Sequence, residues 1–269
     1  MTLPRVVSTT CSNTEIVCAL GCASALVGTD DYSDYPPEVV AHLPRVGPDL
    51  GIDPARVKAL APDLVLASLT VPGHERVVAA LRAAGLPVLA PAPRSIADVL
   101  ADVRTIARAL GVEARGIELA ASMERELAPR SPRADGAPPP RILIEWWPKP
   151  VIVPGRRSWA TDLIARAGGV NPLADADVES TPLAPGEVDG LGVEAIVIAW
   201  CGVPTAKYRP RLVATRPGWA DVPAVRAGRI QPISEAFLGR PGPRLVCGLQ
   251  ALRAVVDLVH AERERSPGR

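Results

Sequence analysis

Apolar and polar positions along the chain follow helical and strand periods, and one helical stretch divides the pattern into two parts. Residues 112–127 place apolar or small side chains three or four positions apart, with charged residues between them. This spacing predicts an amphipathic helix, about 24 Å long at roughly 1.5 Å per residue. The segment 131–140, SPRADGAPPP, is rich in proline and interrupts regular structure directly after that helix.

Strand-like and helix-like segments alternate on both sides of the dividing helix. Before it, the expected strands are 5–9, 25–28, 63–68 and 87–90, and the expected helices are 12–20, 53–60, 73–84 and 95–110. After it, the expected strands are 141–145, 195–200 and 229–232, and the expected helices are Trp159–Ala167, 208–214 and 243–261. A capping box of Ser12 and Glu15 is expected to start the first helix. The alternation predicts an α/β fold with lobes at 1–111 and 131–269, a connecting helix at 112–130, and a ligand cleft between the lobes.

The aromatic residues are few and unevenly distributed. The chain has five tryptophans, three tyrosines and one phenylalanine, and the first half holds only Tyr32 and Tyr35, in one loop. Trp146 and Trp147 follow one predicted strand, and Phe237 follows another. Since open α/β sheets bind ligands outside the carboxyl ends of their strands, these rings are candidates for holding a large flat ligand. The alternative is that tryptophans fill the lobe contact or the second core, which we expect for Trp219.

Composition narrows the class of partner. The formal net charge is +1, so neither a nucleic acid nor an anionic membrane is indicated. The sequence has no run of about 18 apolar residues, which predicts no membrane span. The start MTLPRVVSTT lacks a basic segment followed by an apolar run. We therefore expect a cytoplasmic location, with an extracytoplasmic location after removal of a leader as the alternative.

The chain has five cysteines, an odd number that favours reduced thiols. Cys18 and Cys22 are expected to be small core residues. Cys11 and Cys201 each follow a predicted strand, so either thiol could contact cobalt or another soft metal in a ligand. The favoured interpretation for both is a small residue at a tight turn. An axial-ligand role for His74 is likewise weighed against local hydrogen bonds at a helix start, which are favoured.

No catalytic constellation is visible in the sequence. It contains no GxSxG elbow, no GxxxxGK[ST] loop and no GxGxxG after the first strand. The three histidines are too far apart in the predicted elements to form a zinc or manganese cluster. We therefore expect a binding protein that is not an enzyme, requires no cofactor and holds no metal of its own.

Several segments in order resemble a known family. They are RVVSTTCSNTEIVCALG, DDYSDYPPEV, RVKALAPDLVLAS, IEWWPKPVIVPGRRSW and VRAGRIQPISEAFLGRPGPRLV. Together they resemble the class III periplasmic-type binding proteins of cobalamin and siderophore ABC importers, and most closely the cobalamin-binding proteins. The resemblance implies two Rossmann-like lobes with mainly parallel sheets, joined by a single long α-helix, with little hinge motion and the ligand in the cleft.

The ligand implied by the resemblance is cobalamin or a related corrinoid. Haem or a ferric siderophore is one alternative. A ligand-modifying enzyme or sensor that acts through its cysteines is a second, and an interaction module without a ligand is a third. The candidate ligand contacts are Cys11, Ser12, Tyr32, Tyr35, Leu69, His74, Trp146, Trp147, Trp159, Cys201, Glu235 and Phe237.

The chain departs from the family at two kinds of position. Family members that deliver to a permease present one glutamate on each lobe, but the matching positions here are Ala55, close to Asp53, and the acid-free segment 237–240. The family's disulfide is also absent, since Ala167 and Leu252 lie near its positions. The sequence therefore predicts a cytosolic corrinoid-binding relative, with docking to an ABC permease as the alternative.

Overall fold

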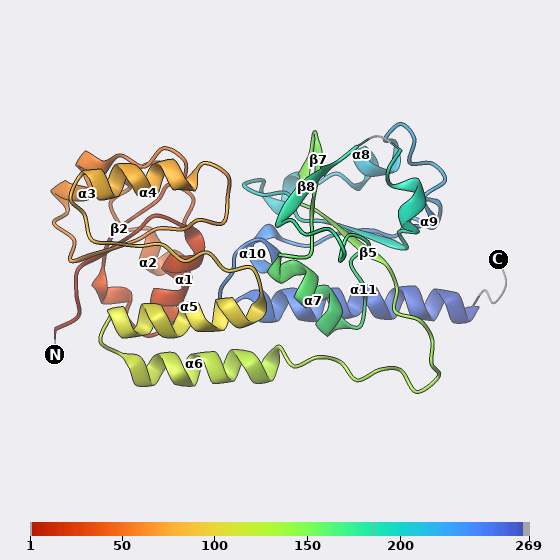
Figure 1. Ribbon diagram of the computed structural model, residues 1–269, viewed down its shortest axis with the longest axis horizontal. Helices are drawn as coiled ribbons and strands as arrows, with labels where there is room; N and C mark the ends of the chain where they lie inside the picture. Colours follow the sequence, from red (N-terminus) through yellow and green to blue (C-terminus); the bar gives the residue numbers. More distant parts are fainter. Residues whose placement is uncertain (1, 185, 266–269) are drawn as a thin grey trace. The chain divides into compact units, whose positions relative to one another are not determined.

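The computed structural model describes residues 2–184 and 186–265, and the chain divides into two compact units (Figure 1). The first unit comprises Met1–Pro93 and Ala97–Glu124, and the second comprises Arg94–Ile96 and Arg125–Arg269. Each unit contains its own parallel sheet. The mainly parallel α/β architecture predicted from the sequence is therefore confirmed. The boundaries at residues 111 and 131 stay a prediction.

The first unit is built around a four-stranded parallel sheet in the order β2-β1-β3-β4. Its strands are β1 Val6–Ser8, β2 Leu26–Thr29, β3 Leu64–Leu66 and β4 Val88–Leu89. Its helices are α1 Cys11–Ala19, η1 Ala23–Ala25, α2 Pro37–Val40, α3 Pro54–Ala59, α4 His74–Ala83, α5 Ile96–Ala109 and α6 Glu113–Glu126. All four predicted strands of this part are present, and α2 and η1 are additions within segments expected to be loop or strand.

Helices cover both faces of this sheet, which explains why β3 and β4 are apolar throughout. Figure 1 shows α4 on one side of the sheet and α1 on the other. On the α4 side, Val78 and Leu81 pack in one cluster with Val7 and Val65 of the strands, and all four are buried. The short strands are therefore positioned by packing on two faces.

The predicted capping box at Ser12 is wrong. The helix α1 begins earlier, at Cys11, and Thr10 is its N-cap without a side-chain cap bond. The carbonyl of Thr10 accepts the Thr14 N–H over 3.2 Å, so the first helical bond forms as soon as the chain leaves β1. Ser12 and Glu15 are buried within the helix instead of bridging its start.

The predicted amphipathic helix is confirmed as α6. It buries Gly116, Ala120 and Met123 on one face, while Ile117 is exposed. A Cβ atom on Gly116 would lie 2.3 Å from the Cβ of Ala107 in α5. Only glycine allows this close approach, so the two helices form one tightly packed pair.

The second unit contains a parallel sheet in the order β10-β9-β5 and a small antiparallel sheet in the order β6-β7-β8. The strands are β5 Ile142–Glu145, β6 Trp147–Pro148, β7 Val151–Pro154, β8 Ser180–Leu183, β9 Ala195–Ile198 and β10 Ile230–Pro232. The helices are α7 Trp159–Ala167, η2 Asp189–Leu191, η3 Thr205–Lys207, α8 Pro210–Ala214, α9 Pro223–Arg226, α10 Glu235–Leu238 and α11 Leu245–Arg265.

The parallel strands and the helix α7 were predicted, but the antiparallel sheet was not. Its strands are two to four residues long. They contain prolines, which lower strand propensity in a sequence-based reading. The peptide bond between Lys149 and Pro150, in the turn between β6 and β7, is cis.

The core of the second unit joins the two sheets. Leu143 and Ile196 of the parallel sheet pack in one cluster with Val153 of the antiparallel sheet. Trp219 belongs to this cluster and is 3% exposed, which confirms its predicted core position. Among residues 2–184 and 186–265, no helix has the length and apolar character needed to cross a bilayer.

Candidate functional site

The first unit gathers six sequence-predicted residues on the loops and helix starts that follow three neighbouring parallel strands. Because β2, β1 and β3 are adjacent and parallel, the segments that follow them leave the sheet at the same edge. Cys11 and Ser12 follow β1, whereas Leu69 and His74 follow β3. Tyr32 and Tyr35 follow β2. We refer to these loops as the first carboxyl edge.

The loop after β2 is held in place by a buried carboxylate. Asp30 has no exposed surface, and its Oδ1 accepts a hydrogen bond from Ser33 Oγ over 2.5 Å. Its Oδ2 accepts the Tyr32 backbone N–H over 2.9 Å. Burial raises the pKa of Asp30, while these hydrogen bonds act in the opposite direction. The side chain of Thr14 in α1 lies 3.0 Å from Ser33 Oγ and thus ties the loop to the helix.

Arg45 holds the same loop from the other side. Its Nη1 donates to the carbonyl oxygens of Asp30, over 2.6 Å, and of Ser33, over 2.9 Å. The loop is thereby fixed while Tyr32 and Tyr35 remain 54% and 45% exposed. Two large rings therefore stand in solvent on a loop whose backbone is hydrogen-bonded from two directions.

His74 is buried and makes local contacts. Its Nδ1 accepts the Val71 backbone N–H over 3.3 Å, and its Nε2 lies 3.5 Å from Asp49 Oδ2. The histidine in turn lowers the pKa of Asp49, chiefly by hydrogen bonding. This geometry supports the favoured interpretation of His74 as a helix-start residue that joins two loops.

Two exposed apolar residues beside this pair were missed by the sequence analysis. Leu50 is 51% exposed and Val71 is 42% exposed, and Leu69 is 38% exposed. A Cβ on Gly73 would lie 3.2 Å from Leu50 Cδ2, which places Leu50 beside the loop that follows β3. An apolar residue inside the polar turn GPDLGID was the available signal. The first carboxyl edge thus carries aliphatic side chains as well as rings.

The second unit also gathers its predicted residues at the carboxyl ends of neighbouring parallel strands. Trp146 follows β5, Cys201 follows β9, and Glu235 and Phe237 follow β10 in α10. The Cys201 N–H donates to the Trp146 carbonyl over 3.0 Å, which joins two of these segments. We refer to them as the second carboxyl edge.

Trp159 is connected to this edge through α10. Its Nε1 donates to the Leu238 carbonyl over 2.7 Å, so the first turn of α7 is attached to the segment after β10. Trp146 is buried, whereas Trp147 is 43% exposed and donates its Nε1–H to the Lys149 carbonyl over 3.1 Å. Of the tandem pair, Trp147 therefore presents its ring to solvent.

Glu145, at the end of β5, forms an internal ion pair. Arg216 donates from Nη1 and Nη2 to its two carboxylate oxygens over 2.8 and 2.9 Å. Trp200 Nε1 donates to the same carboxylate over 2.9 Å, and the Arg216 guanidinium lies 4.3 Å from the Trp219 ring centre. These contacts place Glu145 and Trp200 in the core.

Two arginines near the second carboxyl edge already contact protein groups. Arg240 Nε donates to Glu235 Oε2 over 3.3 Å, and both side chains are largely buried. Arg244 lies 5.6 Å from the Phe237 ring centre. The Arg240 charge is thus compensated by a carboxylate, and the Arg244 guanidinium is attracted to the face of a ring, before any ligand arrives.

The cysteines divide into buried and accessible positions. Cys22 is buried, in agreement with its expected core role, whereas Cys18 is half-buried, and partial burial raises the pKa of its thiol to about 11. Cys11 is half-buried and Cys201 is exposed. Within the described ranges 2–184 and 186–265, no group of three or more His, Cys, Asp or Glu side chains is arranged to hold a metal ion.

Two α/β units, each with polar and aromatic residues at the carboxyl edge of a parallel sheet, define a class of two-lobed binding proteins. The model of the periplasmic binding protein family matches residues 6–235. The chain therefore belongs to the periplasmic binding protein family, and it is a substrate-binding protein of the ABC importer type.

Three similar proteins illustrate the range of that family. The uncharacterised ABC transporter substrate-binding lipoprotein YvrC of Bacillus subtilis is 28% identical over 92% of this chain and 78% of its own length. The vitamin B12-binding protein of Salmonella choleraesuis is 28% identical over 73% of this chain and 72% of its own length. The structure of the periplasmic heme-binding protein RhuT from Roseiflexus sp. RS-1, in apo form, matches with a TM-score of 0.80 and 31% identity, covering 96% of this chain and 99% of that one.

Proposed function

We propose that this protein binds cobalamin or a related corrinoid as the substrate-binding component of an ABC importer. The observation that carries this proposal is the exposure of Tyr32 and Tyr35 on a loop fixed by Asp30 and Arg45. Exposed rings on a preorganised loop can bury the face of a large macrocycle without a further cost of ordering the loop. Trp147 would add a third ring. This function is recognition, without a catalytic step.

The charge arrangement favours a ligand with a neutral rim. A corrin ring carries amide side chains, whereas haem carries carboxylates and many siderophores are anionic. Arg240 already contacts Glu235, and Arg244 lies over Phe237. A carboxylate-bearing ligand would have to compete for these cations, while an amide rim can use backbone groups and hydroxyls in the loops.

Haem is the second candidate, because specific observations favour it. RhuT, the structural relative at 31% identity, is a heme-binding protein. A tyrosine oxygen is also a known type of axial ligand for haem iron. Tyr32 and Tyr35 are the exposed tyrosines that could serve this purpose.

The cellular setting is proposed from the relatives. YvrC is described as a lipoprotein and RhuT as periplasmic, whereas nothing in these comparisons supports the cytoplasmic location expected from the sequence. We therefore favour an extracytoplasmic location and an ABC permease as partner. Asp53, the acid near the expected docking position, accepts hydrogen bonds from the Ala55 and Arg56 N–H groups as the N-cap of α3. If Asp53 also docks to a permease, its carboxylate has to contact the permease while it caps α3.

Titration of the full chain with cyanocobalamin, dicyanocobinamide, haemin and a ferric siderophore, measured by isothermal calorimetry and equilibrium dialysis, tests the proposal. Cyanocobalamin and dicyanocobinamide are expected to bind with similar affinity, since both present the corrin face. The variants Tyr35→Ala and Trp147→Ala should each weaken binding by roughly ten- to a hundredfold, because each removes a stacking ring.

Ile117→Ala is the matched control, since Ile117 is 57% exposed on α6, far in sequence from either carboxyl edge. It should leave corrinoid affinity unchanged. Tight haemin binding that is lost in Tyr35→Phe, without corrinoid binding, would replace the first candidate by the second. Binding of neither macrocycle would refute both.

A further inference from the structure

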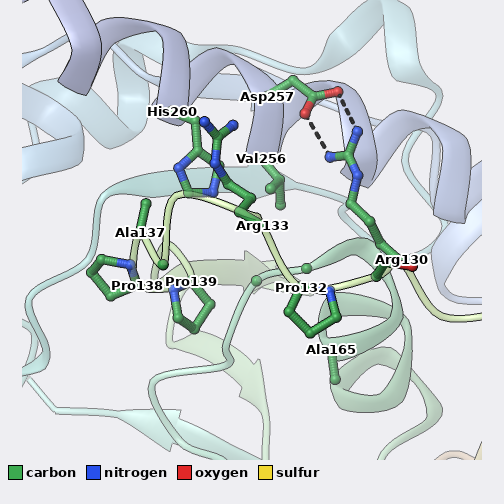
Figure 2. A pocket seen from close by; sticks show the side chains of 14 residues that line it. Arg130, Pro132, Arg133, Ala137, Pro138, Pro139, Ala165, Val256, Asp257 and His260 are labelled. Atoms are coloured by element: carbon green, nitrogen blue, oxygen red, sulfur yellow. Dashed lines mark hydrogen bonds and ion pairs between the residues drawn. The ribbon is translucent and has the colours of Figure 1, made fainter.

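A cavity in the second unit lies at the opposite end of β5 from Trp146. It has a volume of about 560 Å³ and is enclosed by the linker that precedes β5, the end of α7 and the last turns of α11 (Figure 2). The Val170 N–H donates to the Pro140 carbonyl over 2.9 Å, which fixes the linker at the amino end of β5. The cavity is thus separate from the second carboxyl edge, and its volume is typical of sites for small molecules.

The cavity is lined by both polar and apolar groups, and the apolar ones include three prolines. Pro132, Pro138 and Pro139 of the linker line it together with Ala165 and Val256, and Figure 2 shows Pro132 beside Ala165. The adjacent glycine pair at the end of α7 contributes backbone alone. Proline rings present C–H groups, and the face of an aromatic ring carries partial negative charge, so the proline part of the wall suits a flat aromatic body.

One imidazole in the cavity wall has unused hydrogen-bonding capacity. His260 is 5% exposed, and its ring makes no hydrogen bond with any residue in the part of the chain that the structure describes. Burial, followed by the charges of Arg133 and Arg263, lowers the pKa of His260. The ring is therefore neutral near pH 7 and can donate one N–H to a ligand.

The Arg133 guanidinium lies beside this imidazole, and its hydrogen bonds come from two of its three nitrogens. Arg133 donates from Nε and Nη2 to Asp135, and from Nη2 to Glu264 over 2.8 Å. Its Nη1 has no hydrogen bond among the described residues, whereas both terminal nitrogens of Arg130 are engaged by Asp257. Figure 2 shows Arg133 and His260 at the same end of the cavity. Together they offer donors to one acceptor group, and the guanidinium favours a charged acceptor.

We propose that this cavity binds a small planar aromatic carboxylate. The carboxylate accepts hydrogen bonds from Arg133 Nη1 and the His260 ring, and the aromatic body lies between the linker prolines and Val256. Such a ligand would hold the linker against α11 and α7. The site is independent of corrinoid binding, because it uses neither carboxyl edge.

The probe for the test is naphthalene-2-carboxylate, with naphthalene-2-carboxamide as its uncharged counterpart, titrated into the full chain by calorimetry and saturation-transfer NMR. Arg133→Gln should weaken carboxylate binding roughly tenfold, since it removes one charge-assisted contact. Ala165→Phe should abolish binding by filling the cavity from an exposed position on α7. Arg108→Gln is the matched control, because it removes an exposed ion pair with Glu113 in the first unit.

Binding of the carboxylate with at least tenfold preference over the carboxamide, lost in Ala165→Phe and unchanged in Arg108→Gln, would support the proposal. Binding should also persist in Trp147→Ala, which separates this site from the macrocycle site. No binding at millimolar carboxylate would overturn the proposal. Equal binding of the carboxamide, or full binding in Ala165→Phe with a circular dichroism spectrum like that of the native chain, would overturn it as well.

Discussion

Individual carboxylates in this protein differ in how their charge is compensated. Glu145 is fully buried and receives three hydrogen bonds, two of them from the guanidinium of Arg216. Asp102 in α5 has one carboxylate oxygen that is buried without a hydrogen-bond partner among the described residues. Burial, with a further contribution from Asp98, raises the pKa of Asp102 to about 6. The charge of Glu145 therefore stabilises the folded state, whereas the charge of Asp102 destabilises it.

Asp102→Asn should stabilise the protein near neutral pH. Because the pKa of Asp102 is higher in the folded chain than its ordinary value of 3.8, the folded state binds more protons between about pH 4 and 6. Stability contributed by this residue therefore falls as the pH rises through that window. At pH 7.5 the variant should gain about 1 kcal/mol, a value reduced for partial solvation of the side chain.

Urea unfolding of both proteins at pH 7.5 and at pH 3.5 provides the measurement. The gain should vanish at the lower pH, where Asp102 is protonated in the folded chain. An equal difference at both pH values would show that the effect is not electrostatic.

Glu145→Gln should destabilise the second unit by about 3 kcal/mol, because it leaves Arg216 without its counter-charge in a setting where that side chain is only 15% exposed. Asp177→Asn is the contrasting variant, since its ion pair with Arg156 is solvent-exposed and should matter little. Urea unfolding followed by tryptophan fluorescence compares the two. Equal effects for both variants would contradict this assignment.

At the scale of elements, the loop after β2 shows how the sheet edge is prepared for binding. Three carbonyl oxygens, of Asp30, Ser33 and Val40, accept hydrogen bonds from Arg45. The aromatic rings on the loop gain their orientation from these contacts, since the rings themselves are about half exposed.

Arg45→Met should leave the fold intact and loosen this loop. We expect faster amide hydrogen exchange in residues 30–40 and macrocycle affinity lower by roughly tenfold, since each binding event would then have to order the loop. Hydrogen-exchange mass spectrometry measures the first effect, with Arg56→Met as a control because Arg56 is exposed in α3. Unchanged exchange in the loop of Arg45→Met would refute the role of Arg45.

Elements with a local sequence pattern could be predicted from the sequence. Contacts between residues far apart in the chain could not. The strand β3 was predictable from its continuous apolar run, and the helix α6 from its helical period. The start of α1 was misplaced because the capping pattern at Ser12 competes with an earlier start at Cys11. The pairing of Glu145 with Arg216 joins residues 71 positions apart, and no local pattern reveals it. The exposure of Leu50 and Val71 likewise depends on how two loops meet.

At the scale of the whole molecule, two anchored helices connect the units. The chain passes between units near the start of α5 and near the end of α6. The Ile96 N–H donates to Asp162 Oδ2 over 2.9 Å, so a side chain of α7 caps the start of α5. After α6, Arg253 Nη2 donates to the Ala128 carbonyl over 2.6 Å. The segments next to both passages are therefore held by hydrogen bonds within the second unit.

The uneven placement of the rings has an optical consequence. All five tryptophans belong to the second unit, so tryptophan fluorescence reports only on the unfolding of that unit. Unfolding of the first unit changes the far-ultraviolet circular dichroism and leaves the tryptophan fluorescence nearly unchanged. Comparing the two signals in one denaturation series would therefore show directly whether the halves melt together or in succession.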